Sequence, residues 1–361
     1  MNIKSVIVAL LAGIVANYGF ADEIMYGELP PITPEVKKAL ESSTSPKGLD
    51  FVVDSEGGVV PVNITSPNIQ SPIEALALVP SKTSVGIFGN GYAIKSEAIT
   101  DLLGVLPKRV PIRFNIVGGR FNTVDVLRDL VNNTTLKELD LSWNDICLDW
   151  VKTISEGLKN NSTLTVFKLI GNDIKDDGAK VISKALEGNT TLKELDLSWN
   201  FIGDKGAVAI SRVLEALTKL NLSYNAICYD GAKALADTLK NNTTLKTLNL
   251  GYNHIGDEGA KEILEALKEK EESTLAELNL SGNKIGDEGA EVIADFIRSN
   301  GTLRKLGLGE NNISVEGKRM ITEALKAKAG LSVCFSSIIS KGASGISEAL
   351  ETKTTPKGST H

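Results

Sequence analysis

The chain has 361 residues, of which 42% are hydrophobic, 5% aromatic and 23% charged, a composition that excludes a wholly disordered chain and a polytopic membrane protein. A net charge of −6 gives the chain as a whole no basic surface of the kind that nucleic acid requires, so we expect no nucleic-acid partner. With only two histidines and three cysteines, it is poor in the side chains that most often build metal sites and catalytic nucleophile–base pairs. We therefore expect no enzyme activity, no cofactor and no metal site.

Residues 1–21 have the pattern of a cleaved secretory signal peptide. Lys4 precedes an apolar run of eleven residues, Val6 to Ala16, and Gly19 and Ala21 place small residues at −3 and −1 of a cleavage site. The run is shorter than the roughly 20 residues that span a bilayer, and no later apolar segment reaches that length. We expect a mature chain that begins near Asp22, lacks a membrane span and is secreted, periplasmic or at the cell surface; an uncleaved N-terminal anchor is the alternative.

Residues 22–80 are rich in proline, serine and glutamate, which predicts a mostly extended leader rather than a packed domain. One short helix is expected over Pro34 to Ser42, because Thr33 can serve as its N-cap and proline suits the first helical position. The leader has nine acidic and three basic residues, whereas residues 81–361 have 36 acidic and 35 basic residues. The acidity of the chain therefore belongs to the leader, so the exclusion of a nucleic-acid partner cannot rest on the overall charge. It rests on the outward-facing residues of the repeats described below, which alternate in sign and form no continuous basic stripe.

A repeat of 28 residues occupies most of the chain beyond residue 135. LKELDLSWNDI at 136, LTVFKLIGNDI at 164 and LKELDLSWNFI at 192 show it directly, and related segments begin at 220, 245, 275 and 303. Each copy carries one recurring asparagine. These asparagines are Asn144, Asn172, Asn200, Asn225, Asn253, Asn283 and Asn311.

Each repeat combines two periodicities. Leu139 and Leu141 alternate at strand spacing, whereas Gly178, Ala179 and Ile182 begin a run with helical spacing. This change indicates one strand and one helix per repeat. The acidic pair Asp257-Glu258 stands at a helix start, where the unpaired amides favour negative charge, so we interpret such pairs as helix caps and not as calcium ligands.

Weaker copies extend the array at both ends. Val85/Ile87 and Ile112/Phe114 lie at 27-residue steps before Leu139/Leu141, and Val333/Phe335 lie 27 residues beyond Leu306/Leu308. This gives ten strands with degenerate ends, as terminal repeats usually are. We assign the array to residues 81–351, the regular repeats to 136–329 and a polar tail to 352–361.

The pattern LxxLxLxxNxI followed by GAxxIxxAL resembles the leucine-rich repeats of the ribonuclease-inhibitor-like class, which Ran GTPase-activating protein and NOD-like receptors share. The resemblance, together with the signal peptide, is to a bacterial-type exported protein. It implies an α/β solenoid, a curved horseshoe with parallel strands on the concave face and helices on the convex face. It also implies that the recurring asparagines are buried and bond neighbouring loop backbones.

The three cysteines do not suit a disulfide in such an array. Cys147 and Cys228 occupy the same repeat position three repeats apart, about 14 Å at the usual strand spacing, while a disulfide needs Cα atoms within about 7 Å. Cys334 lies farther along, in the last expected strand. We predict three reduced, mostly buried thiols.

Candidate binding residues lie on the concave face and at its edge. Because Leu139 and Leu141 point inward, Glu138, Asp140 and Ser142 should point outward. The acidic candidates are Glu138, Asp140, Glu194 and Asp196. They are either a solvated face or a surface for a basic partner.

An aromatic column stands just after the strands. Trp143, Trp199, Tyr224 and Tyr252 share one repeat position, which is more than so few aromatics would give by chance. The rings either cover the edge of the core or form a binding ladder, since Trp and Tyr dominate interface hot spots. The column alone does not decide between these roles.

Asn133, Asn189 and Asn242 each begin an Asn-Thr-Thr sequence just before a strand. They are either glycan acceptors of a eukaryotic secretory pathway or, more simply, residues that end the preceding helix.

The sequence therefore favours a monomeric exported scaffold that binds another protein through its concave face and adjacent rim, without catalysis. One alternative is a regulator of a small GTPase, suggested only by the likeness to Ran GTPase-activating protein, and another is a secreted inhibitor of an enzyme. A hydrolase housed in residues 22–80 is disfavoured, because that segment has neither histidine nor cysteine.

Overall fold

The computed structural model describes residues 125–335, with gaps at 269–272 and 327–329, and six short strands before them. The early strands are β1 (Gly48–Val53), β2 (Val59–Pro61), β3 (Ser84–Phe88), β4 (Ala93–Ile94), β5 (Ile112–Val117) and β6 (Arg120–Phe121). The predicted signal peptide, the helix at 34–42 and the polar tail lie outside the described residues.

Strand and helix alternate from residue 125 onward. The helices are α6 (Asp125–Asn132), α7 (Leu148–Leu158), α8 (Lys175–Leu186), α9 (Asp204–Ser211), α10 (Tyr229–Leu239), α11 (Gly256–Lys268), α12 (Asp287–Ser299) and α13 (Val315–Lys326). The strands are β7 (Leu136–Asp140), β8 (Val166–Lys168), β9 (Glu194–Asp196), β10 (Lys219–Asn221), β11 (Thr247–Asn249), β12 (Glu277–Asn279), β13 (Lys305–Gly307) and β14 (Ser332–Cys334). A short 3-10 turn, Leu214–Ala216, replaces the end of a helix where the repeat is three residues shorter.

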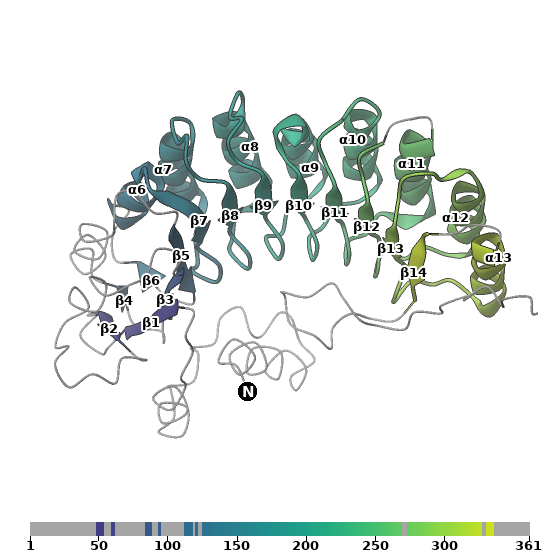
Figure 1. Ribbon diagram of the computed structural model, residues 1–361, viewed down its shortest axis with the longest axis horizontal. Coiled ribbons are helices and arrows are strands. Elements are labelled where there is room, and N and C mark those ends of the chain that lie inside the picture. The colour runs from purple at the N-terminus through teal and green to yellow at the C-terminus, as the bar shows by residue number, and fades with distance from the viewer. Residues whose placement is uncertain are drawn as a thin grey trace, which may run out of the picture.

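The strands form one sheet whose order follows the chain. From β14 to β7, then β5, β3 and β1, each strand pairs in parallel with its neighbour, and β2 closes the sheet as an antiparallel partner of β1. Equivalent residues lie side by side; Leu220, for example, pairs with both Leu195 and Leu248. The strands line the inner side of an arc and the helices its outer side, which confirms the predicted α/β solenoid (Figure 1).

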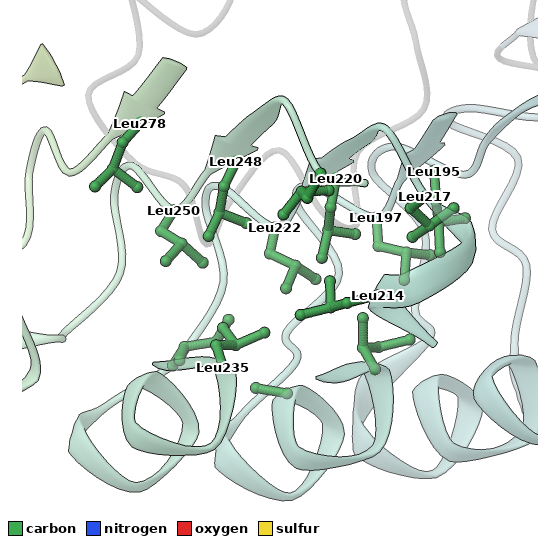
Figure 2. Packing of buried hydrophobic residues seen from close by; sticks show 14 of the residues in the cluster. Leu195, Leu197, Leu214, Leu217, Leu220, Leu222, Leu235, Leu248, Leu250 and Leu278 are labelled. Carbon is green, nitrogen blue, oxygen red and sulfur yellow. The ribbon is translucent and has the colours of Figure 1, made fainter. Parts of the chain in front are cut away.

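The core lies between the two layers. Leucines of the strands, such as Leu220, Leu222 and Leu248, point toward Leu214 and Leu235 on the outer side (Figure 2). These side chains are almost fully buried, and burial of a leucine stabilises the fold by about 1.5–3 kcal/mol. Each repeat buries its apolar residues against the next, so the core is continuous along the array.

Two details at the N-terminal end differ from the sequence prediction. Strands β1 and β2 fall within residues 22–80, so the sheet begins inside the segment assigned as a leader. The register also differs, because Phe114 and not Ile112 is the residue opposite Leu139. A register shift between Ile112 and Arg113 absorbs the irregular spacing, which a fixed 27-residue step could not anticipate.

Candidate functional site

The recurring asparagines hold adjacent repeats together. The Asn172 side-chain oxygen accepts hydrogen bonds from the backbone amides of Asn144 and Ile146, both at 3.0 Å. Its side-chain nitrogen donates to the carbonyls of Leu141 and Leu169. Asn225 does the same for the repeat before it, through the amides of Asn200 and Ile202. Because buried backbone groups need partners, these bonds fix the loop that leads from each strand to its helix.

A column of polar residues crosses the middle of the concave face. The structure places Asp140, Lys168, Asp196, Asn221, Asn249 and Asn279 there, on successive strands. Asp196 Oδ1 accepts bonds from the amide and hydroxyl of Ser198, at 3.0 and 2.6 Å. Ser142 makes the same bonds to Asp140 and is only 3% exposed, so the expectation that it faces outward was wrong. Its hydroxyl turns back to donate to Asp140 and accepts from the backbone amide of Ile170 in the next repeat, at 3.2 Å.

The charged residues on this face are largely paired within the array. Lys168 Nζ lies 2.7 Å from Glu138 and 3.9 Å from Asp140. Glu194 contacts Lys219 at 3.0 Å, and Glu277 contacts Lys305 at 2.8 Å. Of the four predicted acidic binding residues, only Asp196 has none of these ion pairs; its Oδ2 accepts from the Asn221 amide at 2.9 Å.

Burial changes the acidity of this column. It raises the pKa of Asp140 above its usual value, although Lys168 and Ser142 act to lower it. Burial likewise raises the pKa of Asp196, against the hydrogen bonds from Ser198 and Asn221. For Lys168, burial lowers the pKa, but Asp140 and Glu138 outweigh it and the pKa is raised. The column therefore holds charges that have lost part of their hydration.

The aromatic column occupies a turn with an unusual backbone. Trp143, Trp199, Tyr224 and Tyr252 all have positive φ, between 54° and 60°. The equivalent positions in other repeats are Gly171, Gly282 and Glu310, also with positive φ. A left-handed conformation costs a bulky residue about 1–2 kcal/mol, so the column is a fixed turn of the repeat as well as a set of rings.

The rings stack along the rim. The ring centroids of Trp199 and Tyr224 are 4.0 Å apart and those of Tyr224 and Tyr252 are 4.2 Å apart, nearly parallel in both pairs. Trp143 reaches Trp199 across the intervening repeat, at 6.2 Å and a tilt of 48°. It can do so because Gly171 has no side chain in that space. Gly282 likewise leaves room for Tyr252, 2.7 Å from where a Cβ would lie.

Exposure differs along this aromatic ladder, which consists of Trp143, Trp199, Tyr224 and Tyr252. Trp143 at one end is 37% exposed, while the other three are half-buried. Burial, followed by the neighbouring Tyr252, raises the pKa of the Tyr224 hydroxyl well above its usual value. Phe201, two residues after Trp199, is 49% exposed on the same rim and was not singled out by the sequence prediction. The ladder therefore packs against itself and still presents an aromatic surface at the Trp143 end.

The Asn-Thr-Thr asparagines end the preceding helices, as predicted, and also shape the turn before the next strand. Their backbone amides donate to carbonyls in the last turn of α6, α8 and α10. Asn189 Oδ1 accepts from the backbone amides of Thr191 and Leu192, and its side-chain nitrogen donates to the carbonyl of Asn161 in the preceding repeat. Asn133 and Asn242 make the same turn with their own neighbours. Asn133, Asn161 and Asn189 form a second asparagine ladder on the opposite rim, because the side-chain nitrogens of Asn161 and Asn189 donate to backbone carbonyls of the preceding repeat. Their constant position just before the first strand leucine is the signal that could have revealed it.

The acidic helix starts also act between repeats. Asp176 Oδ1 accepts from the amides of Gly203 and Gly206, which begin the next helix, and Asp204 does the same for Cys228 and Gly231. The sequence prediction of capping residues holds, but each of these aspartates caps the helix of the following repeat. The amides at a helix start are the groups that need such acceptors.

The cysteines form no disulfide, and all three lie within the described residues. The prediction that they are mostly buried was wrong, because Cys147 is exposed and Cys228 and Cys334 are half-buried. Cys147 and Cys228 stand immediately before α7 and α10, one residue past the buried Ile146 and Ile227.

Within the part of the chain that the structure describes, no helix is both long enough and apolar enough to cross a membrane. Over the same residues, no cluster of three or more histidine, cysteine or acidic side chains could hold a metal ion.

Comparison with known proteins shows which repeat family these segments match. A family model for the leucine-rich repeat matches residues 132–146, 160–183, 188–211, 216–236, 241–264 and 272–294. No curated protein sequence matches the chain significantly. Among solved structures, the chain is similar to leiomodin-1 actin-binding site 2, with 27% identity, 48% of this chain and 86% of that chain covered, and a TM-score of 0.31.

Proposed function

We propose that this leucine-rich-repeat solenoid is a non-catalytic scaffold that binds another protein through its concave face and the adjacent rim. The observation that carries the proposal is the aromatic ladder, which ends in the exposed Trp143 beside a polar, partly charged face. Trp and Tyr supply large, rigid contact area and are enriched among the residues that dominate binding energy.

The form of the surface supports the same proposal. The seven described strands from β7 to β13 present their outward side chains in register, so a partner would meet a continuous face with a fixed spacing. Side chains on this face vary from repeat to repeat, whereas the recurring asparagines are constant and the inward strand residues are all leucine except Phe167. A constant frame with a variable surface suits recognition of one particular partner.

The test is affinity capture from the medium or cells that the protein meets, with the full chain as bait. Trp143→Ala should reduce recovery of the specific partner by tenfold or more. Tyr229→Ala is the matched control, because Tyr229 is 39% exposed but lies at the start of α10 in the helical layer. Recovery of the same partners by wild type and by Trp143→Ala would contradict the proposal.

We also propose that the protein is exported by its N-terminal signal, as residues 1–21 indicate. Sequencing of secreted material should give an N-terminus near Asp22. An intact Met1 on protein recovered only from the cytoplasm would contradict export.

A further inference from the structure

The outer end of the aromatic ladder has an uncovered apolar surface. Trp143 contacts Trp199 on one side, with ring centroids 6.2 Å apart. On the other side, β5 pairs with β7 so that Asn115 lies opposite Asp140. Three residues farther along each strand, the residue that corresponds to Trp143 is Gly118. A glycine brings no side chain to cover the ring, and Trp143 is 37% exposed.

A second exposed aromatic residue lies farther along the same rim. Phe201 is 49% exposed and follows β9, whereas Trp143 follows β7, so the two residues lie two strands apart. Two strand spacings amount to about 10 Å. Both residues have positive φ within the fixed turn of the repeat. The rim therefore presents two apolar contacts whose spacing is set by the backbone.

The chain itself contains a segment with a matching spacing. Residues 29–34, which lie outside the described residues, read LPPITP and place Pro31 and Pro34 three positions apart. A proline-rich segment favours the polyproline II helix, which has three residues per turn and rises about 3.1 Å per residue. In that helix, prolines three positions apart face the same side at a distance of about 9 Å. Surfaces lined by aromatic rings are the ones that bind Pro-x-x-Pro segments.

We propose that residues 29–34, which we call the strap, dock on the aromatic rim of their own chain and that a protein partner has to displace them. Pro34 lies against Trp143 and Pro31 against Phe201. This direction follows from the sheet order, because Pro34 is the proline nearer to β1 along the chain and Trp143 is the ring nearer to β1 in the sheet. The contact itself needs no partner, so it does not depend on the proposed function.

The length of the chain permits this contact. Gly48, the first residue of β1, is in register with Glu138 of β7 three strands away, and Trp143 lies five residues beyond Glu138. These offsets correspond to about 14 Å across the strands and about 17 Å along them, or about 22 Å in all. The 13 residues between Pro34 and Gly48 span up to about 43 Å when extended, and about 28 Å if residues 35–42 are helical.

A linker that spans its two sites also strengthens a weak contact. Short flexible linkers hold a tethered segment at an effective concentration in the millimolar range. The strap therefore occupies the rim even if a free peptide of the same sequence binds only weakly. A free peptide at micromolar concentration does not displace it.

A peptide of residues 27–36 tests the strap, titrated against the full chain by isothermal titration calorimetry. Pro31→Ala/Pro34→Ala, the strap variant, should bind the peptide at least fivefold more tightly than wild type, whose own strap occupies the rim. Pro67→Ala/Pro72→Ala is the matched control. It also removes two prolines, but they stand five positions apart, out of step with the three-residue turn, so it should bind the peptide as wild type does.

Two further variants locate the contact on the rim. When added to the strap variant, Trp143→Ala and Phe201→Ala should each weaken peptide binding at least fivefold, whereas Tyr229→Ala in the helical layer should not. Circular dichroism should show the same fold for every variant. Equal affinity of the peptide for wild type and the strap variant, no binding to either, or binding indifferent to Trp143 or to Phe201 would overturn the inference.

Acrylamide quenching of tryptophan fluorescence detects the contact within the chain without any peptide. The strap variant should be quenched more than wild type, because its Trp143 ring is uncovered. This difference should disappear when both chains also carry Trp143→Phe. Identical quenching of wild type and the strap variant would count against the strap as directly as the titration.

The strap and the proposed function fail in different ways. If the peptide behaves as expected but Trp143→Ala leaves partner capture unchanged, the strap stands and the partner does not bind through the aromatic rim. If capture depends on Trp143 but the strap variant binds no peptide, the inference fails and the scaffold proposal stands. If both hold, the strap variant should recover severalfold more of the partner than wild type.

Discussion

Each residue of the aromatic ladder has positive φ, a backbone conformation that bulky residues avoid. Stacking at 4.0 and 4.2 Å gives the Tyr224 ring a partner on each side, and such aromatic pairs contribute about 0.5–1.5 kcal/mol beyond their buried area. This gain is of the same size as the cost of the left-handed turn. The column of aromatics could be read from the sequence, but the sign of φ could not, because glycine and glutamate share the position.

Gly171→Ala should destabilise the fold by about 2–4 kcal/mol, because the methyl group would overlap the Trp143 ring in addition to the cost of positive φ. Gly188→Ala is the control, since Gly188 also has positive φ but nothing lies within 4 Å of its Cβ position. The Gly188→Ala variant should lose only about 1 kcal/mol of its free energy of unfolding. Urea unfolding gives the two free energies, and equal losses would show that Trp143 does not occupy the Gly171 space.

Asp196→Asn should raise the melting temperature at pH 7. Burial raises the pKa of Asp196 in the folded chain, so its carboxylate form opposes folding and stability falls as pH rises from the unfolded to the folded pKa. The gain in the variant should therefore shrink as the pH is lowered toward about 4, the unfolded pKa of an aspartate. Melting temperatures of the variant and of wild type, measured at several pH values across this range, test whether the gain shrinks.

The control for this experiment is Asp177→Asn, in which the lost carboxylate is exposed and has its pKa lowered by Lys180. It should not raise the melting temperature. A lower melting temperature for Asp196→Asn at pH 7 would contradict the argument and show that the amide does not replace the carboxylate in the turn.

The starts of α9, α10, α12 and α13 are capped by an aspartate of the preceding repeat. Asp257, in the first turn of α11, accepts from Gly286 and Gly289 at the start of α12, at 2.6 and 3.1 Å. The glycine is required by this contact, because a Cβ at Gly289 would meet the Asp257 carboxylate. Sequence periodicity located the acid at the helix start, yet it could not show which helix the acid caps, since that depends on stacking.

Asp257→Ala should destabilise the protein by about 0.5–2 kcal/mol, the usual loss for a removed cap. Hydrogen exchange should accelerate at the first amides of α12 and not at those of α11. Glu258→Ala, which changes an exposed residue one position later, is the control and should leave both helices unchanged. Faster exchange confined to α11 would contradict capping between repeats.

Over the whole molecule, the sequence predicts the regular repeats well and the N-terminal end of the array poorly. The strands from Leu139 to Val333 lie where the 28-residue period puts them, because the leucines that define the period are also the buried core. At the N-terminal end the spacing is irregular, so the register of β5 and the strands β1 and β2 were missed. The concave residues could be placed by alternation alone, whereas their ion pairs depend on side-chain reach and could not.

Leu248→Ala should cost about 2–5 kcal/mol, since Leu248 is completely buried in the middle of the array. Because each repeat contacts only its neighbours, hydrogen exchange should accelerate most in α10 and α11 and least in α7 and α13. Thr247→Ala, on the concave side of the same strand, should have little effect on either measurement. Uniform loss of protection along the array would contradict nearest-neighbour coupling.

The aspartate that caps the next helix has a consequence for how such an array changes in length. The donor and acceptor occupy corresponding positions in successive repeats, as Asp176 with Gly206 and Asp204 with Gly231 show. Duplication or deletion of one whole period among the repeats that share this pair therefore joins an aspartate to a glycine start as before. The array can therefore gain or lose repeats by recombination and keep the capping contact between neighbours. The same step lengthens or shortens the columns of side chains on the concave face.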